Sequence, residues 1–288
     1  MDNVELEFYI KKLKKFYEIK VIGESVLGRN IYAFNKQYNE NFKWALVSGG
    51  IHAREHISTD LIVLFMEKLT HLEEQKFNIS FVPLLNPDGA DLVINGLKNV
   101  ATAYKSKLTQ INKSADFSLF KANANGVDLN NNFDANWDNK FTKSLEPSSQ
   151  GFYGEKKMSE PEVIAISSWA KSLDLYLSIS YHTKGEEIYY DFFQKGEIRQ
   201  RDMKIAKVFS QSTGYEIKST EKVSSGGFKD WCVQKLGVPA LTIELGDDSL
   251  MHPLSRKHIP LIYAKNKMIF QNLEKSLKIF DYYKKNKN

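Results

Sequence analysis

The sequence predicts a single α/β domain with a mixed, mostly parallel central sheet flanked by helices. Strand-like apolar segments alternate with helical patterns through most of the 288 residues, which is the order expected of a parallel sheet with crossover helices. No internal repeat is present, and no linker is rich enough in Pro, Gly or Ser to divide the chain. We therefore expect residues 1–288 to form one domain.

Helices are predicted by apolar residues spaced three and four apart and by residues typical of helix ends. The first is expected over residues 4–17, from Leu6 to Phe16. In SEPEVIAISSWAKSL we expect a capping box from Ser159 to Glu162, with Pro161 just inside the helix. The other helices are expected over 58–69, over 198–213 before Gly214, over 228–236 before Gly237, and over 260–283.

Four strands are predicted from short apolar or alternating runs. They cover residues 44–47 before Gly49-Gly50, residues 77–85 before a turn signal at NPDG, residues 173–181, and residues 239–245. Residues 101–157 are polar and poorly periodic, and a stretch of this length in a compact domain is usually functional.

Composition excludes several classes of function. Lys and Arg total 40 against 35 Asp and Glu, and the net charge of +5 is spread along the chain, so nucleic-acid binding is not expected. No apolar run is long enough for a membrane span, and the first residues lack the apolar core of a signal peptide. Cys232 is the single cysteine, which excludes an intrachain disulfide. These features predict a cytoplasmic protein, with non-classical release as the alternative.

A metal site is predicted from His52, Glu55 and His182. His52 and Glu55 follow a predicted strand and a Gly-Gly turn, and His182 ends another predicted strand. Because α/β proteins bind ligands at the carboxyl ends of their strands, these side chains should meet there. Two imidazoles and one carboxylate form a catalytic zinc site with a fourth position left open. Considered without the other two residues, His182 could equally be a buried histidine with a structural role in the core.

Another interpretation is open, because HAREH also spells the inverted zincin pattern, in which His52 and His56 both bind the metal. That pattern requires one continuous helix, whereas the helix-start signals come only at Ser58. We therefore expect His56 to lie beside the metal site rather than in it.

Glu244, in TIELG, ends an apolar strand, where a buried acid is costly unless it is paired or functional. It is the candidate general base.

Six motifs in one order resemble the zinc carboxypeptidases of the carboxypeptidase A type, from about residue 20 to 270: GGIHAREHIS, NPDG, KANANGVDLNNNFD, SEPE, SYHT and TIELG. Four segments narrow the resemblance to the bacterial γ-D-glutamyl-diaminopimelate peptidases, which cut murein stem peptides: SVLGRNI, KANANGVDLN, YHTKGEEIYY and GGFKDW. The resemblance implies that His52, Glu55 and His182 bind one zinc ion per chain and that Glu244 is the general base.

The same resemblance implies roles for residues that contact the substrate. Lys121 stands where the family usually has an arginine that polarises the scissile carbonyl; lysine supplies the charge but not the bidentate fork. Asn130 matches the asparagine that holds the substrate carboxylate, whereas Asn131 replaces an arginine that clamps a terminal carboxylate. Phe228 is expected in place of a mobile tyrosine that covers the substrate. Arg54, with Asn130 and Asn131, is a candidate for the carboxylate of diaminopimelate.

The sequence thus predicts a zinc metallopeptidase that hydrolyses the γ-D-glutamyl-meso-diaminopimelate bond of murein peptides. Three alternatives stay open: an ordinary metallocarboxypeptidase, an N-acyl-amino-acid deacylase, and a non-catalytic relative that binds murein peptides. The sequence makes no prediction of the oligomeric state, of the peptide length or stereochemistry accepted, or of the physiological role.

Overall fold

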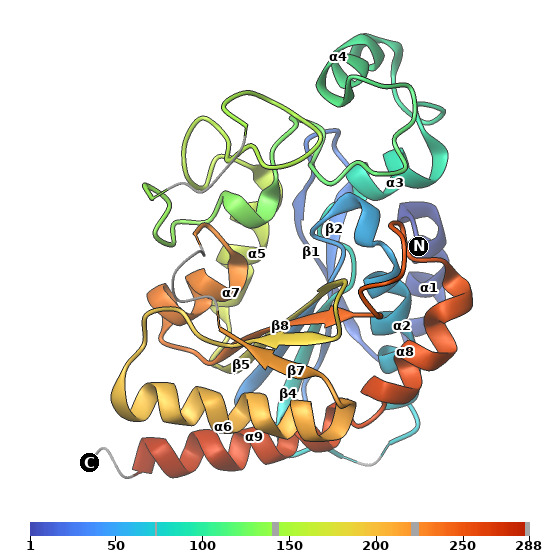
Figure 1. Cartoon of the computed structure of the whole chain (residues 1–288). Coiled ribbons are helices and arrows are strands. Elements are labelled where there is room, and N and C mark those ends of the chain that lie inside the picture. The colour runs from blue at the N-terminus through green and yellow to red at the C-terminus, as the bar shows by residue number, and fades with distance from the viewer. Residues whose placement is uncertain (73, 140–143, 220–224, 286–288) are drawn as a thin grey trace.

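The computed structural model describes residues 1–72, 74–139, 144–219 and 225–285. An eight-stranded sheet in the order β1-β2-β4-β3-β5-β8-β6-β7 forms its centre (Figure 1). Within the described residues, four of the seven neighbouring strand pairs are parallel, which confirms the α/β class and the mixed sheet. The strands are β1 (Glu18–Glu24), β2 (Asn30–Lys36), β3 (Trp44–Ser48), β4 (Asn78–Val82), β5 (Leu175–Thr183), β6 (Glu187–Tyr189), β7 (Glu216–Lys218) and β8 (Ala240–Leu245).

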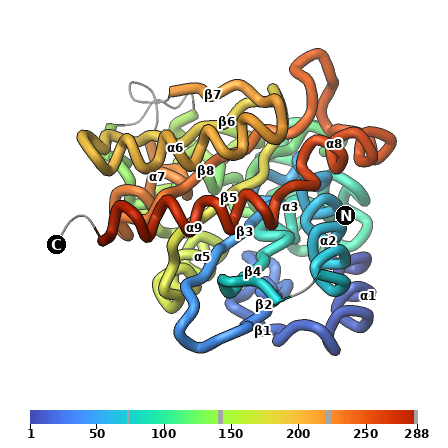
Figure 2. The backbone as a smooth tube through the Cα atoms, turned by 90° about the horizontal axis from the view of Figure 1, so that it is seen from below, coloured from blue at the N-terminus to red at the C-terminus, as the bar shows by residue number. Residues whose placement is uncertain are grey.

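Helices cover both faces of this sheet (Figures 1 and 2). They are α1 (Asn3–Leu13), α2 (Ile57–Leu69), α3 (Pro87–Asn95), α4 (Thr102–Asn112), α5 (Pro161–Ser172), α6 (Gly196–Thr213), α7 (Phe228–Trp231), α8 (Ile259–Asn266) and α9 (Ile269–Lys285). Alternate residues of β3 point to opposite faces: Ala45 and Val47 join a core with α2, α6 and α9, and Leu46 joins a core with α5 and α7. Among the described residues, no helix is both long and apolar enough to span a bilayer.

Most predicted elements are confirmed. The helix expected over 58–69 is α2, and the four expected strands are β3, β4, β5 and β8, each with small shifts of its ends. Gly214 and Gly237 end α6 and the π-helical turn that follows α7, with φ angles of 78° and 66° that glycine adopts without strain. Strands β1, β2, β6 and β7 were not predicted: β1 has no buried residue and β6 and β7 have three residues each, whereas β2 has seven residues of which four are buried.

Three local predictions are corrected. The first helix ends at Leu13, so Phe16 lies beyond it, and the final helix is divided into α8 and α9. The turn signal at Asn86 is the start of α3, where the Asn86 Oδ1 atom accepts from the Gly89 amide at 2.9 Å.

The capping box at α5 is wrong, although Pro161 does occupy the first turn of the helix. The Ser159 hydroxyl donates to Glu160 Oε1 at 2.7 Å and accepts from Asn132 Nδ2 at 3.1 Å, rather than from a backbone amide of the helix. Glu162 is buried, and its carboxylate oxygens accept from Asn123 Nδ2 at 3.1 Å and from the Val26 amide at 3.2 Å. Burial raises the pKa of Glu162 to about 8.

Candidate active site

Strands β3, β5 and β8 run parallel, so their carboxyl ends meet at one edge of the sheet. After β3 the chain turns at Gly50, where φ is +62° and a Cβ atom would lie 2.8 Å from Leu84 Cδ1. This close approach requires glycine. His52 follows the turn and Glu55 ends the short 3₁₀ turn Ala53–Glu55, while His182 is the penultimate residue of β5.

His52, Glu55 and His182 converge at this edge. The Nδ1 atom of His52 lies 2.9 Å from Glu55 Oε1, and the Nδ1 atom of His182 lies 3.1 Å from Glu55 Oε2. The two Nδ1 atoms are 3.2 Å apart. All three side chains are buried, and within the described ranges they form the one group of this kind that could hold a metal ion.

The electrostatics of the group favour a cation among these atoms. Burial lowers the pKa of His52, but Glu55 and Asp128 outweigh it and raise the pKa overall. Burial opposes ionisation of Glu55, yet His52 and His182 hold its pKa well below the usual range. The Thr183 amide also donates to Glu55 Oε2 at 3.2 Å. Two imidazole nitrogens and one carboxylate are donors that suit zinc, so the residues present fit the ion.

Asp128 was not assigned a role from the sequence, although it lies within the KANANGVDLN motif. Its Oδ1 atom is 3.2 Å from His52 Nε2, on the side of the ring away from the metal group. Its Oδ2 atom accepts from Lys121 Nζ at 2.8 Å and from the Gly151 amide at 3.2 Å. A carboxylate behind a ligand histidine fixes its ring and increases its basicity. Asp128 is therefore a positioning residue that couples His52 to Lys121.

Glu244 lies directly across from His182 in the parallel register of β5 and β8. Its Oε2 atom is buried and has no hydrogen-bond partner among the described residues. Burial raises the pKa of Glu244 to about 8, and the negative charge of Glu55 adds to this while His182 opposes it. An unpartnered carboxylate beside the metal group is the arrangement that a proton acceptor requires.

Lys121 lies beside the same group. Its side chain is 22% exposed, and its ammonium is paired with Asp128. The Ala53 amide donates to the Lys121 carbonyl at 3.0 Å, which joins this loop to the turn that carries Glu55. Burial lowers the pKa of Lys121, but Asp128 and Glu55 outweigh burial and raise it, so the side chain stays cationic.

Asn130 and Asn131 lie in the short turn Leu129–Asn131, against the segment that precedes α7. The Phe228 amide donates to Asn130 Oδ1 at 3.0 Å. At Gly226, where φ is +73°, a Cβ atom would lie 2.3 Å from the Asn131 carbonyl oxygen. This contact explains the glycine and shows how closely the two segments pack.

The structure corrects the expectation for the Phe228 side chain. Its ring is 1% exposed, stacks on Trp231 with a centroid distance of 6.0 Å, and lies 5.2 Å from the Phe133 ring. A ring buried in this core cannot cover a substrate. The apolar side chain gains more from burial there than from exposure to solvent.

His56 lies outside the metal group, at the start of α2, so the residues do not form the inverted zincin arrangement. Its Nδ1 atom is 3.2 Å from the Met1 amine. Burial lowers the pKa of His56 to about 3, and the Met1 ammonium adds to this.

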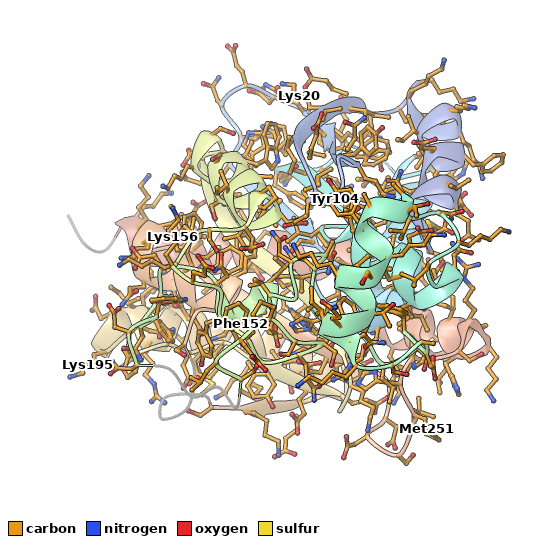
Figure 3. All side chains as sticks on the ribbon, turned by 90° about the horizontal axis from the view of Figure 1, so that it is seen from above. Lys20, Tyr104, Phe152, Lys156, Lys195 and Met251 are labelled. Carbon is orange, nitrogen blue, oxygen red and sulfur yellow. The ribbon has the colours of Figure 1, made fainter. Side chains whose placement is uncertain are left out.

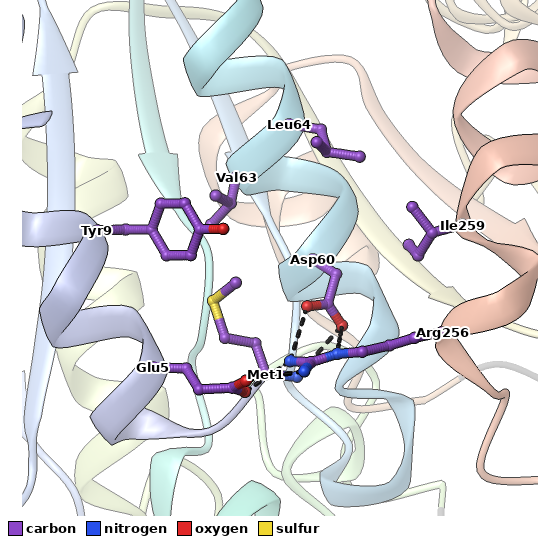
Figure 4. Close-up of a pocket in the computed structure, with 8 residues that line it drawn as sticks. All are labelled: Met1, Glu5, Tyr9, Asp60, Val63, Leu64, Arg256 and Ile259. Atoms are coloured by element: carbon purple, nitrogen blue, oxygen red, sulfur yellow. Dashed lines mark hydrogen bonds and ion pairs between the residues drawn. The ribbon is translucent and has the colours of Figure 1, made fainter. Parts of the chain in front are cut away.

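A separate cavity of about 280 Å³ lies next to His56 (Figure 4). At one of its walls, Asp60 pairs with both the Met1 amine and Arg256. That cavity is lined by Met1, Glu5, Tyr9, Asp60, Val63, Leu64, Arg256 and Ile259.

Arg54 has different surroundings from Asn130 and Asn131. Its Nη1 atom donates to the Leu119 carbonyl and to Gln150 Oε1, both at 3.3 Å. The three residues that the sequence grouped as one carboxylate site therefore lie in two different sets of contacts.

Within the described residues, a buried His-Glu-His group lies at the carboxyl edge of a mixed sheet beside a carboxylate oxygen that has no hydrogen-bond partner, which is the arrangement of a zinc-dependent peptidase. The chain belongs to the zinc carboxypeptidase family, whose model matches residues 6–268.

Two relatives cover most of the chain. The gamma-D-glutamyl-L-diamino acid endopeptidase 1 of Lysinibacillus sphaericus is 33% identical, over 91% of this chain and 69% of the relative. The uncharacterized protein YqgT of Bacillus subtilis (strain 168) is 32% identical, over 91% of this chain and 74% of the relative.

Solved structures agree with the fold. Bovine thrombin-activatable fibrinolysis inhibitor, in complex with tick carboxypeptidase inhibitor, has a TM-score of 0.73 at 20% identity, with 98% of this chain and 95% of that chain covered. The murein-tripeptide amidase MpaA from Escherichia coli O157 has a TM-score of 0.57 at 21% identity, with 89% and 91% covered.

Proposed function

We propose that this zinc peptidase hydrolyses the amide bond between γ-D-glutamate and meso-diaminopimelate in murein peptides. The convergence of His52, Glu55 and His182 beside the unpartnered Glu244 carboxylate carries the hydrolytic part of the proposal. The substrate part is supported by the Lysinibacillus sphaericus relative, whose name gives γ-D-glutamyl-L-diamino acid bonds as its target. Asn131, a neutral residue where an arginine would clamp a plain terminal carboxylate, supports it as well.

In this proposal His52, Glu55 and His182 hold one zinc ion per chain. Zinc, when bound, would supply a Lewis acid that polarises the scissile carbonyl and lowers the pKa of water. Glu244 takes a proton from the attacking water and later passes it to the leaving amine. The ammonium of Lys121 favours the negative charge that develops on the carbonyl oxygen, at a position fixed by Asp128.

The leaving diaminopimelate is held on the side of Asn130 and Asn131. Their amides offer neutral hydrogen bonds, so they select less strongly than an arginine for a bare C-terminal carboxylate. Selectivity then depends on the second polar centre of diaminopimelate. The binding partner in this proposal is the substrate, a murein-derived peptide.

The test is to compare kcat/KM for L-Ala-γ-D-Glu-meso-diaminopimelate and for hippuryl-type carboxypeptidase substrates, with mass spectrometry of the products. We expect cleavage between D-Glu and diaminopimelate, and hippuryl substrates cut at least about 100-fold less efficiently, which is about 2.7 kcal/mol in the transition state. Equal or better turnover of hippuryl substrates would identify an ordinary carboxypeptidase. Preferential turnover of N-acyl amino acids would identify a deacylase, and binding of the tripeptide without turnover in added zinc would identify a non-catalytic relative.

A further inference from the structure

Residues 121–128 form a turn that ends in two polar side chains of the site. Lys121 and Asp128 are seven positions apart, yet the Lys121 Nζ atom donates to Asp128 Oδ2 at 2.8 Å. The Oδ1 atom of Asp128 is 3.2 Å from the Nε2 atom of His52. The path of the chain between Lys121 and Asp128 therefore decides whether both side chains reach the site.

Asn123 closes this turn. Its backbone amide donates to the Val127 carbonyl at 2.9 Å, and its carbonyl accepts from the Gly126 amide at 2.9 Å. Its side-chain Oδ1 atom accepts from the Asn125 and Val127 amides, both at 3.1 Å. An asparagine that bonds to the backbone two and four residues further along the chain fixes the shape of a loop. Asn123 is also fully buried, so water does not compete for these hydrogen bonds.

Two buried carboxylates accept from the other end of the Asn123 side chain. Its Nδ2 atom donates to Glu160 Oε2 at 2.7 Å and to Glu162 Oε2 at 3.1 Å. Within the part of the chain that the structure describes, the donors to these two carboxylates are amides and the Ser159 hydroxyl. A buried carboxylate that loses a donor is costly, so both acids favour one orientation of the Asn123 amide. The turn is thereby attached to the start of α5.

The two ends of the turn are attached to another segment. The Lys121 amide donates to the Ser149 carbonyl at 2.9 Å, and the Asp128 amide donates to the Phe152 carbonyl at 2.8 Å. Phe152 lies near the middle of the face of the molecule that Figure 3 shows. Backbone contacts therefore hold the ends of the turn, and the Asn123 side chain holds the stretch between them.

We propose that Asn123, held by Glu160 and Glu162, is a positioning residue that sets the Lys121 ammonium and the Asp128 carboxylate relative to the metal group. Asn123 acts through the turn and contacts none of the three ligand residues in the described structure. A displacement of a catalytic group by about 1 Å can cost about 100-fold in rate. The part of the inference that concerns Lys121 rests on the proposed function, whereas the part that concerns Asp128 rests on the metal group.

The first arm of the experiment measures the zinc Kd of the wild type, Asn123→Ala, Asp128→Asn and the double variant by competition with a chelator. We expect Asn123→Ala to raise Kd by about 10-fold, the lower end of the range for a lost partner of a ligand histidine. In the Asp128→Asn background the same change should alter Kd by less than about twofold, because its effect passes through Asp128. Equal effects in both backgrounds would refute the positioning of Asp128.

The second arm measures kcat and KM for L-Ala-γ-D-Glu-meso-diaminopimelate at saturating zinc. We expect Asn123→Ala to lower kcat by about 10-fold with little change in KM, because the misplaced ammonium acts on charge that develops during the reaction. In a Lys121→Met background the same change should lower kcat by less than about twofold. An equal fall in both backgrounds would refute the positioning of Lys121. If the wild type does not cleave this peptide, the proposed function is wrong, and the zinc arm still decides the role of Asn123.

Asn78→Ala is the matched control. Asn78 is also fully buried and also holds a loop: its Oδ1 atom accepts from the Tyr38 amide at 2.8 Å, and its Nδ2 atom donates to the Asn39 and Phe42 carbonyls at 2.7 and 2.8 Å. It begins β4, which runs parallel to β3, so it lies at the edge of the sheet opposite the metal group.

Asn78→Ala should lower the thermal unfolding midpoint, as Asn123→Ala does, but should keep the zinc Kd and kcat of the wild type. If it changes both quantities as much as Asn123→Ala does, the effects come from general destabilisation and the proposal is refuted. Should Asn123→Ala fail to fold, Glu160→Ala takes its place in both arms, because it removes the nearer acceptor of the Asn123 amide and leaves the contacts within the turn. The same outcomes then support or refute the proposal.

Discussion

Replacing Asp128 with asparagine should weaken zinc binding, although Asp128 does not itself belong to the metal group. Asp128 faces two N–H groups, one with each carboxylate oxygen: Oδ1 lies at ion-pair distance from His52 Nε2, at 3.2 Å, and Oδ2 accepts from Lys121 Nζ at 2.8 Å. Asparagine has one acceptor oxygen, so one of these donors would face an NH₂ group. Loss of a carboxylate behind a ligand histidine typically costs 10- to 100-fold in metal affinity, which is about 1.4–2.7 kcal/mol.

Competition with a chelator of known zinc affinity, at fixed pH, measures this change in Kd. Asp134→Asn is the matched control, because Asp134 likewise pairs with two basic side chains, Lys157 at 2.8 Å and Lys235 at 2.9 Å, but it lies near the surface and neither partner is a histidine. Its Kd for zinc should equal that of the wild type. Equal Kd values for wild type and Asp128→Asn would refute the coupling of Asp128 to His52.

Three further outcomes follow from the site and its surroundings. A three-ligand site should hold roughly one zinc per chain, and His182→Ala should lose most of it, whereas His56→Ala should keep it. Elemental analysis measures the zinc content of both variants. Zinc loss in His56→Ala would instead support the inverted zincin arrangement. Glu244→Gln should retain zinc while kcat falls by about 100-fold or more, and a near-normal kcat would exclude Glu244 as the base. Because the folded-state pKa of Glu162 is raised to about 8, its contribution to stability is complete below pH 4.5 and is lost as the pH rises through 8, by at most about 1.4 kcal/mol per pH unit. In urea unfolding between pH 5 and 8, the free energy of unfolding should depend less on pH for Glu162→Gln than for the wild type. The same pH dependence in both proteins would contradict the raised pKa of Glu162.

Local patterns were sufficient to predict the centre of the fold. β3, β5 and β8 are buried runs bounded by glycine or polar residues, and α2 and α6 have apolar spacing and clear ends. The sequence also grouped His52, Glu55 and His182, because strand ends of a parallel sheet meet at one edge. The edge strands were missed because they are short or exposed, so burial leaves little pattern in them: β1 has no buried residue, and β7 has only three residues.

Contacts between distant segments could not be predicted from local patterns. Glu162 has the spacing of a capping residue but bonds to Asn123, and only the tertiary structure shows that partner. Phe228 follows two glycines, as a residue in a mobile loop would, but packs between Phe133 and Trp231. Likewise, the role of Asp128 depends on which side chains it faces across the site, and sequence spacing carries no such information.

The register that pairs His182 with Glu244 also constrains how a chain of this kind can diversify. Both residues belong to adjacent central strands, so the spacing between ligand and base is set by backbone hydrogen bonding in the core, at about 4.8 Å between strands. A one-residue slip would turn one side chain to the opposite face of the sheet. Arg54 and Asn130, in contrast, stand on turns, and such connections generally tolerate insertion and substitution better than strands. Changes in these connections could therefore alter which amide bond is cleaved, while the distance between the proton acceptor and the metal ligands stays the same.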